Sequence, residues 1–447
     1  MSEERGLVDF STGSISEKIV AFALPLFLGN LFQQLYNAAD TLIVGNFLGS
    51  KALAAVSSSS SLIFMMVGFF NGLAVGAGVV ISHAFGAKDK ERLERAIYSD
   101  IAFGIIAGIV LTAFAVIFTP SILRWISTPE DILPLSSDYF RIYSAGIFFS
   151  VMYNILMGIM NALGDSRHPL YYLIISSLIN IFLDLLFIAG FGMGVGSAAA
   201  ATIISQAVSS LLCFIRLFRG EGGIEVRLRR IRIHKRELRG IISYGLPAGL
   251  QNSIIGLANT VVQASVNTFS AAAIAGFGVY GKIEGFVLLP ITTFALSLTT
   301  FVAQTMGSGD LQRTRKGVME GMVMDIVSGE IVGILLFLIA PLLVSLFSSD
   351  PEVIEFGVRQ ARLEALFYFL PAISHASAGV LRGAGKAFIP MLVLLGAWCI
   401  IRVIFVSIAL HFSHDIMLIY IAYPLTWLIS ASIFLFLIIR GRWIWKA

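Results

Sequence analysis

The chain has 447 residues, of which 57% are hydrophobic and 13% are charged, and its formal net charge is +4. Soluble globular domains carry about 25% charged residues. The composition, with a mean hydropathy of +0.87, excludes a soluble protein and predicts a polytopic membrane protein. Its two cysteines, Cys213 and Cys399, lie in apolar segments, which excludes a disulfide framework and a paired-cysteine metal site. Residues 1–18 lack the apolar core of a signal peptide, so we expect the N-terminus to stay in the cytoplasm.

Twelve apolar segments of at least about 20 residues follow one another along the sequence, and each can cross a hydrocarbon core of about 30 Å. The expected spans cover residues 15–47, 52–86, 93–120, 131–163, 168–190, 195–218, 237–269, 272–306, 314–347, 352–384, 388–411 and 415–440. We therefore expect an all-α polytopic membrane protein with twelve transmembrane helices.

The basic residues predict the orientation of these spans. Most of the 31 lysines and arginines fall in the loops on one side, including nine from Arg216 to Arg239. By the positive-inside rule, both termini and the central loop are cytoplasmic, in a multi-pass protein of the cell inner (plasma) membrane. The basic run at 226–239 could bind nucleic acid, but a linker lying near anionic membrane lipid fits better, and we expect no nucleic-acid partner.

The two halves of the sequence repeat. Gly158 and Gly379, Gly164 and Gly385, and Pro169 and Pro390 are each 221 residues apart (379 − 158, 385 − 164, 390 − 169). Six spans per half is an even number, so the halves form two six-helix bundles related by a parallel internal repeat. We expect an N-terminal lobe at 1–218, a basic cytoplasmic linker at 219–236 and a C-terminal lobe at 237–447. Parallel repeats of this kind occur in transporters whose bundles rock about a central substrate.

Polar residues on the first span predict a functional face. Gln33, Tyr36, Asn37 and Asp40 are spaced i, i+3, i+4 and i+7, so they form one stripe on a helix. An acid in a membrane helix costs roughly 2.5 to 3.5 kcal/mol and should face a cavity or a partner. Pro25 precedes the stripe and could act as a hinge, because proline leaves the carbonyl at i−4 without its hydrogen bond.

Other spans of the first half could converge on Asp40. The candidates are Asn154 on the fourth span, Asn180 and Asp184 one turn apart on the fifth, and Thr202 and Gln206 one turn apart on the sixth. Two carboxylates in one pocket repel each other, so at least one should bind a proton. Asp40, Asn180, Asp184 and Thr202 are also suitable oxygen ligands for Na⁺. The sequence leaves H⁺ and Na⁺ open as the coupling ion, leaves a packing role for the acids as the alternative, and predicts no cofactor and no other metal.

The second half lacks this pocket. At the repeat distance Asp40 corresponds to Val261 or Val262, Asn180 to Ile401 and Asp184 to Phe405. This half keeps Lys282, Glu284 and His375, which we group with Gln33, Asn37, Asn154 and Gln206 as candidate residues of a substrate cavity. Arg402 is a candidate partner of Glu284. Because no HExxH, GxSxG or Gly-rich phosphate loop is present, we do not expect an enzyme.

Several segments carry a family resemblance. The opening PLFLGNLFQQLYNAADTLIVGNFLG, the ALAAV start of the second span, and the turns GIMNALGDSRHP and GVLRGAGKAFIP together resemble the multidrug and toxic compound extrusion (MATE) family. The resemblance covers essentially the whole chain and is nearest to the DinF-like branch. It implies an efflux antiporter that exchanges organic cations or amphipathic compounds for H⁺ or Na⁺ by alternating access. By position it implies coupling roles for Tyr36, Asp40, Asn180, Asp184 and Thr202 and a bending role for Pro25.

One alternative from the same superfamily is a flippase for a lipid-linked sugar or lipid. Such a cavity should carry several cationic residues for a pyrophosphate, and of the lysines and arginines only Lys282 and Arg402 qualify as candidates for that role. We therefore expect a multidrug exporter whose partners are small amphipathic or cationic molecules and membrane lipid, and which acts as a monomer.

Overall fold

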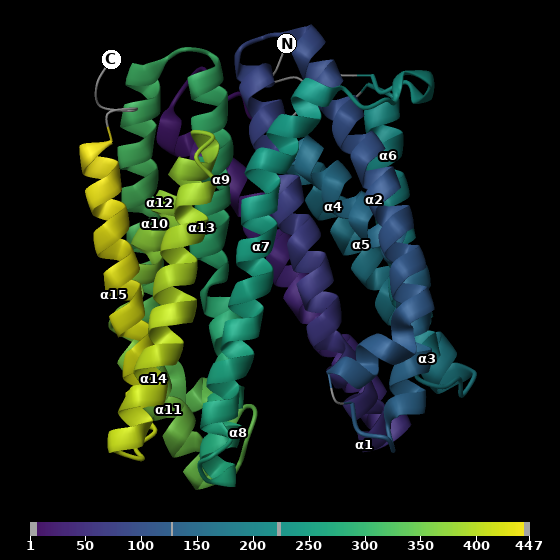
Figure 1. Ribbon diagram of the computed structural model, residues 1–447, viewed down its shortest axis with the longest axis vertical. Coiled ribbons are helices and arrows are strands. Elements are labelled where there is room, and N and C mark those ends of the chain that lie inside the picture. The colour runs from purple at the N-terminus through teal and green to yellow at the C-terminus, as the bar shows by residue number, and fades with distance from the viewer. Residues whose placement is uncertain (1–6, 127, 221–224, 442–447) are drawn as a thin grey trace. The chain divides into compact units, whose positions relative to one another are not determined.

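The computed structural model describes residues 7–126, 128–220 and 225–441, and within these ranges every regular element is a helix (Figure 1). The helices are α1 (Ile15–Gly86), α2 (Lys90–Trp125), α3 (Leu133–Ala145), α4 (Ile147–Ala162), α5 (Arg167–Asp184), η2 (Leu185–Gly190), α6 (Gly196–Phe218), η3 (Leu228–Arg230), α7 (Lys235–Val266), α8 (Ala271–Val287), α9 (Leu289–Gly307), α10 (Leu311–Ser345), α11 (Pro351–Ala365), α12 (Phe369–Gly383), α13 (Phe388–Leu394), η4 (Leu395–Ile401), α14 (Arg402–Phe412) and α15 (Met417–Arg440). The predicted all-α polytopic class is confirmed.

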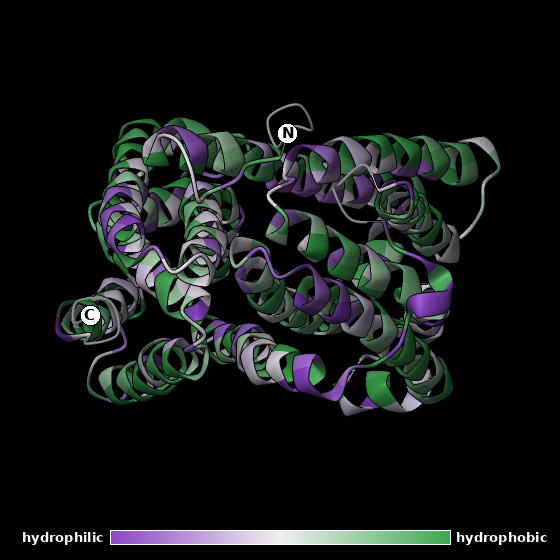
Figure 2. Ribbon diagram, turned by 90° about the horizontal axis from the view of Figure 1, so that it is seen from above, coloured by the Kyte–Doolittle hydropathy of each residue, from purple (hydrophilic) through white to green (hydrophobic). Residues whose placement is uncertain are grey.

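Each of the twelve expected spans lies in one helix or in helices joined by a short break. In the described ranges, eight helical runs are long and apolar enough to cross a membrane, or nine if α3 and α4, bent by 47°, form one span. Runs of large apolar side chains are exposed on α2 and α10, where a soluble protein would carry polar groups. Figure 2 shows hydrophobic residues distributed along the helices of the described chain.

The first two expected spans are continuous in α1 except at Gly49. This residue has φ 83° and ψ −179°, a conformation that glycine adopts without strain, and it is the position inside α1 with non-helical backbone angles. The helix therefore turns at Gly49, between the two predicted spans. At Pro25 the backbone angles stay helical, so α1 continues through the proposed hinge without a break.

The chain folds into two compact units. Unit 1 comprises Leu24–Gly249 with the segment up to Asp9, and unit 2 comprises Phe10–Ala23 with the chain from Leu250 onward. These units differ from the expected lobes in two short exchanged segments, because the start of α1 belongs to unit 2 and the start of α7 to unit 1. Residues 221–224 of the expected linker lie outside the described ranges. Both exchanges end within three residues of a proline, at Pro25 and Pro247.

Glycine contacts explain why the start of α7 belongs to unit 1. A Cβ added to Gly76 of α1 would lie 2.1 Å from the backbone nitrogen of Gly245, and one added to Gly72 would lie 2.3 Å from that of Gly249. Each helix thus presents a GxxxG pair to the other, which lets the backbones approach to a distance that any side chain would prevent.

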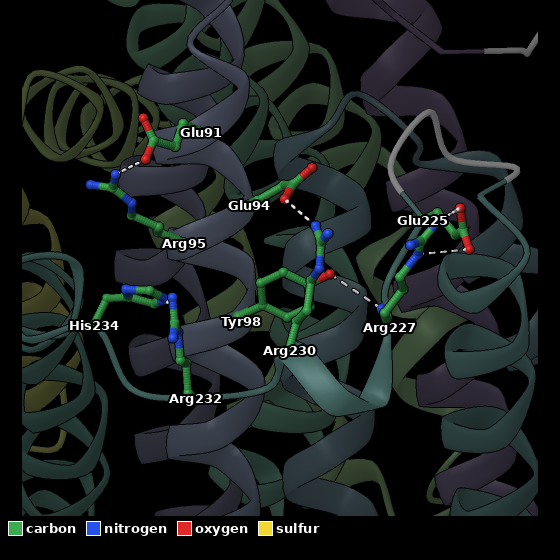
Figure 3. A network of polar contacts seen from close by, with 9 residues as sticks. All are labelled: Glu91, Glu94, Arg95, Tyr98, Glu225, Arg227, Arg230, Arg232 and His234. Carbon is green, nitrogen blue, oxygen red and sulfur yellow. Dashed lines mark hydrogen bonds and ion pairs between the residues drawn. The ribbon is translucent and has the colours of Figure 1, made fainter.

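The linker before α7 is also attached to unit 1. Val226 is fully buried, the backbone nitrogen of Arg227 donates to the Tyr98 hydroxyl at 3.2 Å, and that of His234 donates to the Ser99 hydroxyl at 2.9 Å. Arg230 forms an exposed ion pair with Glu94 on α2 (Figure 3). The described part of the linker therefore lies along α2 as an ordered strap, with its basic side chains outward.

Phe10 anchors the start of the chain in unit 2. Its fully buried ring packs edge-on against Phe22 and Phe301, both at 5.4 Å, and its backbone nitrogen donates to Gln304 Oε1 at 3.2 Å. Arg313 of α10 then donates to the Phe10 and Thr12 carbonyls at 2.6 and 2.7 Å.

The glycine contact predicts a specific loss of stability. Gly245→Ala places a methyl group 2.9 Å from the Cα and the carbonyl oxygen of Leu73 on α1, so the two helices must separate, and overpacking of this kind costs about 1–3 kcal/mol. We expect a lower melting temperature for the purified variant in detergent. Gly278→Ala on α8 is the matched control, because a Cβ there meets no atom within 4 Å. Equal melting temperatures for the two variants would contradict the close α1–α7 packing.

Candidate functional site

Two carboxyl groups of unit 1 face each other. Asp40 lies in α1 and Asp184 is the last residue of α5, directly before the π-helix η2, and the two carboxyls lie close enough to interact with one another. In the described chain, Asp40 Oδ1 and both carboxyl oxygens of Asp184 are buried and receive no hydrogen bond. Two carboxylates have no proton to share, so the pair needs a proton or a cation between them.

Neutral polar groups complete this site. Asn180, one turn before Asp184, is 1% exposed and donates to the Thr202 hydroxyl at 3.4 Å. The Tyr36 side chain lies close enough to the Gln206 amide to interact with it. The Asn180 and Gln206 amide oxygens are buried and receive no hydrogen bond from the described residues. They therefore add free oxygen ligands beside the two carboxyls.

Three other predicted residues lie apart from these contacts. Gln33 is half-buried and Asn37 is exposed, although both share a helix with Asp40. Asn154 is buried and donates its amide to the Ser150 carbonyl of its own helix at 2.8 Å.

Two tyrosines that the sequence analysis missed lie beside the carboxyls. Tyr139 and Tyr143 of α3 are 5% and 7% exposed, and their rings stack at 6.4 Å. Asp40 and Asp184 act electrostatically on the Tyr139 hydroxyl. Their spacing of four residues was the available signal. We name the unit-1 cluster by its members, Tyr36, Asp40, Tyr139, Tyr143, Asn180, Asp184, Thr202 and Gln206.

The predicted residues of the second half lie in or near a separate polar cluster. Lys282 is exposed and its ammonium lies 5.9 Å from the Phe347 ring centre, while the His375 ring meets Trp398 edge-on at 5.3 Å. Glu284 is half-buried and interacts with Arg402 electrostatically, without a direct ion pair in the described chain. We name the unit-2 cluster by its members, Tyr280, Glu284, Gln360, Glu364, Tyr368, Arg402, Tyr423 and Thr426.

Another buried acid of unit 1, Asp165, contrasts with the carboxyl pair. It lies in the turn between α4 and α5, is 1% exposed, and accepts hydrogen bonds from Arg216 Nε at 2.9 Å and His168 Nδ1 at 2.8 Å. Burial alone would raise the pKa of Asp165, but the His168 hydrogen bond and the charges of His168 and Arg216 outweigh it and hold the pKa below its usual value. This carboxylate is structural and already balanced.

The family comparison finds the same repeat. A family model named MatE matches the chain twice, over residues 25–186 and 247–408, and the two matches begin 222 residues apart (247 − 25). Together they cover more than half of the chain.

Similar proteins extend over nearly the full length. The chain is 27% identical to the probable multidrug resistance protein YoeA of Bacillus subtilis, covering 98% of this chain and 95% of that protein. It is 28% identical to the probable multidrug resistance protein YpnP of the same organism, covering 86% of each. A solved MOP superfamily transporter from Pyrococcus furiosus has the same fold, with a TM-score of 0.92, 23% identity, and coverage of 98% of this chain and 99% of that one.

The missing donors predict opposite effects for two Asp→Asn substitutions. Asp184→Asn removes one negative charge and supplies an amide donor to Asp40, so the free energy of unfolding should rise by about 1–2 kcal/mol. Asp165→Asn breaks a buried ion pair and should lower it by about 3 kcal/mol. Because the pKa of Asp165 is depressed in the folded state, its contribution is present above the unfolded pKa and is lost as pH falls through the folded one.

Thermal unfolding of the purified variants across pH checks both effects. The loss of stability of Asp165→Asn relative to the wild type should shrink in acid, because the wild type then loses its own Asp165 ion pair. A destabilised Asp184→Asn, comparable to Asp165→Asn at neutral pH, would contradict a donor-free carboxyl pair.

Proposed function

Because the chain belongs to the MATE family of transporters, we propose that it is an antiporter that exports organic cations or other amphipathic compounds in exchange for H⁺ or Na⁺. One observation carries the proposal: the Asp40 and Asp184 side chains adjoin each other, and three of their four oxygens are buried without a donor. The names of the relatives YoeA and YpnP support multidrug substrates.

In the proton-coupled form, one proton shared by the two carboxyls removes their repulsion. Releasing it restores a second negative charge in a buried site, which is costly at low dielectric. The loaded and unloaded states therefore differ by one charge at the point where α1 meets α5. Tyr139, Asn180 and Thr202 hold the two acids in position and supply neutral polar surroundings.

In the sodium-coupled form, the same oxygens would act as ligands. Na⁺ prefers hard oxygen donors, and the two carboxylates, the free Asn180 amide oxygen and the Thr202 hydroxyl form such a set. In both forms one cation neutralises the same pair of carboxyls, so we expect the same conformational change from either ion.

We propose that this charge change alters the bending of α1 at Pro25. The proline cannot donate to the Ala21 carbonyl, so the helix is weakened at this turn. It lies next to the boundary at Leu24, where α1 passes from unit 2 to unit 1. A change in how Asp40 packs against α5 would then be transmitted along α1 to the point where the units join.

The remaining candidate residues are proposed as substrate contacts. Gln33, Asn37 and Asn154 belong to the first unit, and Lys282, Glu284 and His375 to the second. A flippase would need exposed cationic residues for a pyrophosphate. Arg402 is 3% exposed and already bonded to Thr426, so Lys282 remains the accessible one of the two, which supports the exporter over the flippase.

Asp40→Asn should remove coupling. An amide has no exchangeable charge at neutral pH, so ion-driven efflux of a cationic dye from proteoliposomes should fall at least tenfold, under an imposed pH or Na⁺ gradient. Separate gradients identify the ion. Asp138→Asn is the control, because Asp138 lies on α3 beside Tyr139 but is exposed. Unchanged coupled efflux by Asp40→Asn would refute the assignment, and movement of a lipid-linked sugar without dye efflux would favour the flippase.

We also propose that the linker strap faces the cytoplasmic leaflet and binds anionic lipid. Arg229, Arg232 and Arg236 are exposed and form no ion pair with the acidic residues that the structure describes. Leu228 and Ile233 among them are 60% and 40% exposed, an arrangement typical of a membrane-surface segment.

Neutralising the three arginines should weaken this interaction. Each basic residue near an anionic surface contributes about 1 kcal/mol. R229Q/R232Q/R236Q should therefore lose most of the thermal stabilisation that phosphatidylglycerol gives the wild-type protein in nanodiscs, and added salt should erase the difference. K88Q/K90Q/R92Q changes the same number of charges at another turn. An equal loss in this control would contradict a specific role for the strap.

A further inference from the structure

The two polar clusters occupy equivalent positions of the internal repeat. Four pairs lie 221 residues apart: Tyr139 and Gln360, Tyr143 and Glu364, Thr202 and Tyr423, and Gln206 and Trp427 (360 − 139, 364 − 143, 423 − 202, 427 − 206). The first member of each pair belongs to the unit-1 cluster. Of the second members, three belong to the unit-2 cluster and Trp427 packs against it, 6.1 Å from the Tyr423 ring. Equivalent positions of the internal repeat therefore form a polar cluster in both units, but they carry different side chains.

The clusters differ in their charged groups. The unit-1 cluster has two carboxyls and no basic side chain. The unit-2 cluster also has two carboxyls, on Glu284 and Glu364, but adds the guanidinium of Arg402. Arg402 immediately follows Ile401, the counterpart of Asn180 (401 − 180 = 221).

Arg402 is fixed in place. It is 3% exposed, its Nε and Nη2 donate to Thr426 Oγ1 at 3.2 and 3.1 Å, and its guanidinium lies 4.1 Å from the Tyr423 ring centre and 5.8 Å from that of Trp398. A guanidinium keeps its proton inside a protein. A permanent positive charge buried in a membrane span requires a negative partner.

Glu364 and Glu284 are the acids that interact electrostatically with Arg402. Glu364 is fully buried and accepts from the Tyr280 hydroxyl at 2.9 Å and Gln360 Nε2 at 2.8 Å, both neutral donors. Glu284 lies one turn after Tyr280 on α8, and both acids interact electrostatically with Arg402. The other titratable groups around the cluster are Tyr280, Tyr368, Cys399, Tyr423, Tyr420 beside Glu364, and His375 with Arg382 behind it.

We propose that Arg402 is a tethered counter-cation, which supplies to the carboxyl pair of unit 2 the positive charge that an exchangeable ion supplies to Asp40 and Asp184. One glutamate balances the guanidinium and the other retains a proton, so the cluster is neutral without taking up a further ion. The inference rests on the proposed ion coupling in unit 1. It gives a physical reason for coupling to be confined to that unit.

The test is Arg402→Met, which keeps an apolar stem and removes the charge. The folded variant then needs one more proton or Na⁺ at its carboxyl pair. A folded state that binds an extra proton is most stable at low pH and loses stability as pH rises. The folding equilibrium constant of R402M should fall up to tenfold more per pH unit than that of the wild type, measured by thermal unfolding in detergent. NaCl, compared with choline chloride, should reduce the extra slope.

Two further variants decide the outcome. R402K keeps the charge and should show the wild-type pH profile, and E284Q/R402M removes one acid with the cation and should lose the extra slope. A wild-type slope in R402M, or an unchanged extra slope in the double variant, would overturn the proposal. If R402M yields no folded protein, a folded double variant supports the pairing and an unfolded one overturns it. Because no substrate or gradient is used, the result is independent of the Asp40→Asn efflux assay.

Discussion

A charge inside a membrane span has to be balanced by a neighbouring group or a bound ion, and the arrangement of both units follows from this constraint. Hydrocarbon offers no water to screen it, so a carboxylate must find a donor, a counter-charge or a proton. In unit 1 the Asp40 and Asp184 carboxyls have been brought together with almost no donors around them. This arrangement costs folding energy, which is typical of a site retained for function rather than for stability.

Both clusters lie where an α-helix meets a π-helix. Asp184 ends α5 and η2 begins at the next residue, whereas η4 ends at Ile401 and Arg402 begins α14. A π-helical turn inserts a residue and changes the direction of the side chains that follow, and such turns are frequent at functional sites. At these junctions a charged side chain can point into the unit, while the helical segments before and after it keep their apolar faces toward lipid.

Helical spacing and the repeat distance predicted much of the fold and part of the site from sequence. Tyr36 and Asp40, and Asn180 and Asp184, are one turn apart, so a single apolar helix suffices to place each pair on one face. Tyr139 and Tyr143 were missed because their segment reads as a polar helix end, and their role depends on where α3 packs. For Gln33 and Asn37 the sequence predicted too much. Helical spacing places them on the same face as Asp40, but the packing of α1 does not cover that whole face, so Asn37 is exposed and Gln33 is half-buried. The exchanged segments depend on contacts such as Phe10 with Phe301, which no local pattern encodes.

The exchange of segments makes each half of the chain incomplete on its own. A polypeptide ending before the linker would carry Phe10–Ala23, which belongs to unit 2, and would lack the α7 turn whose glycines seat against Gly72 and Gly76. The complementary polypeptide would lack the aromatic anchor at Phe10. We therefore expect that cutting the linker alone would not yield two autonomous six-helix proteins, because each fragment would lack a segment that packs in its own unit.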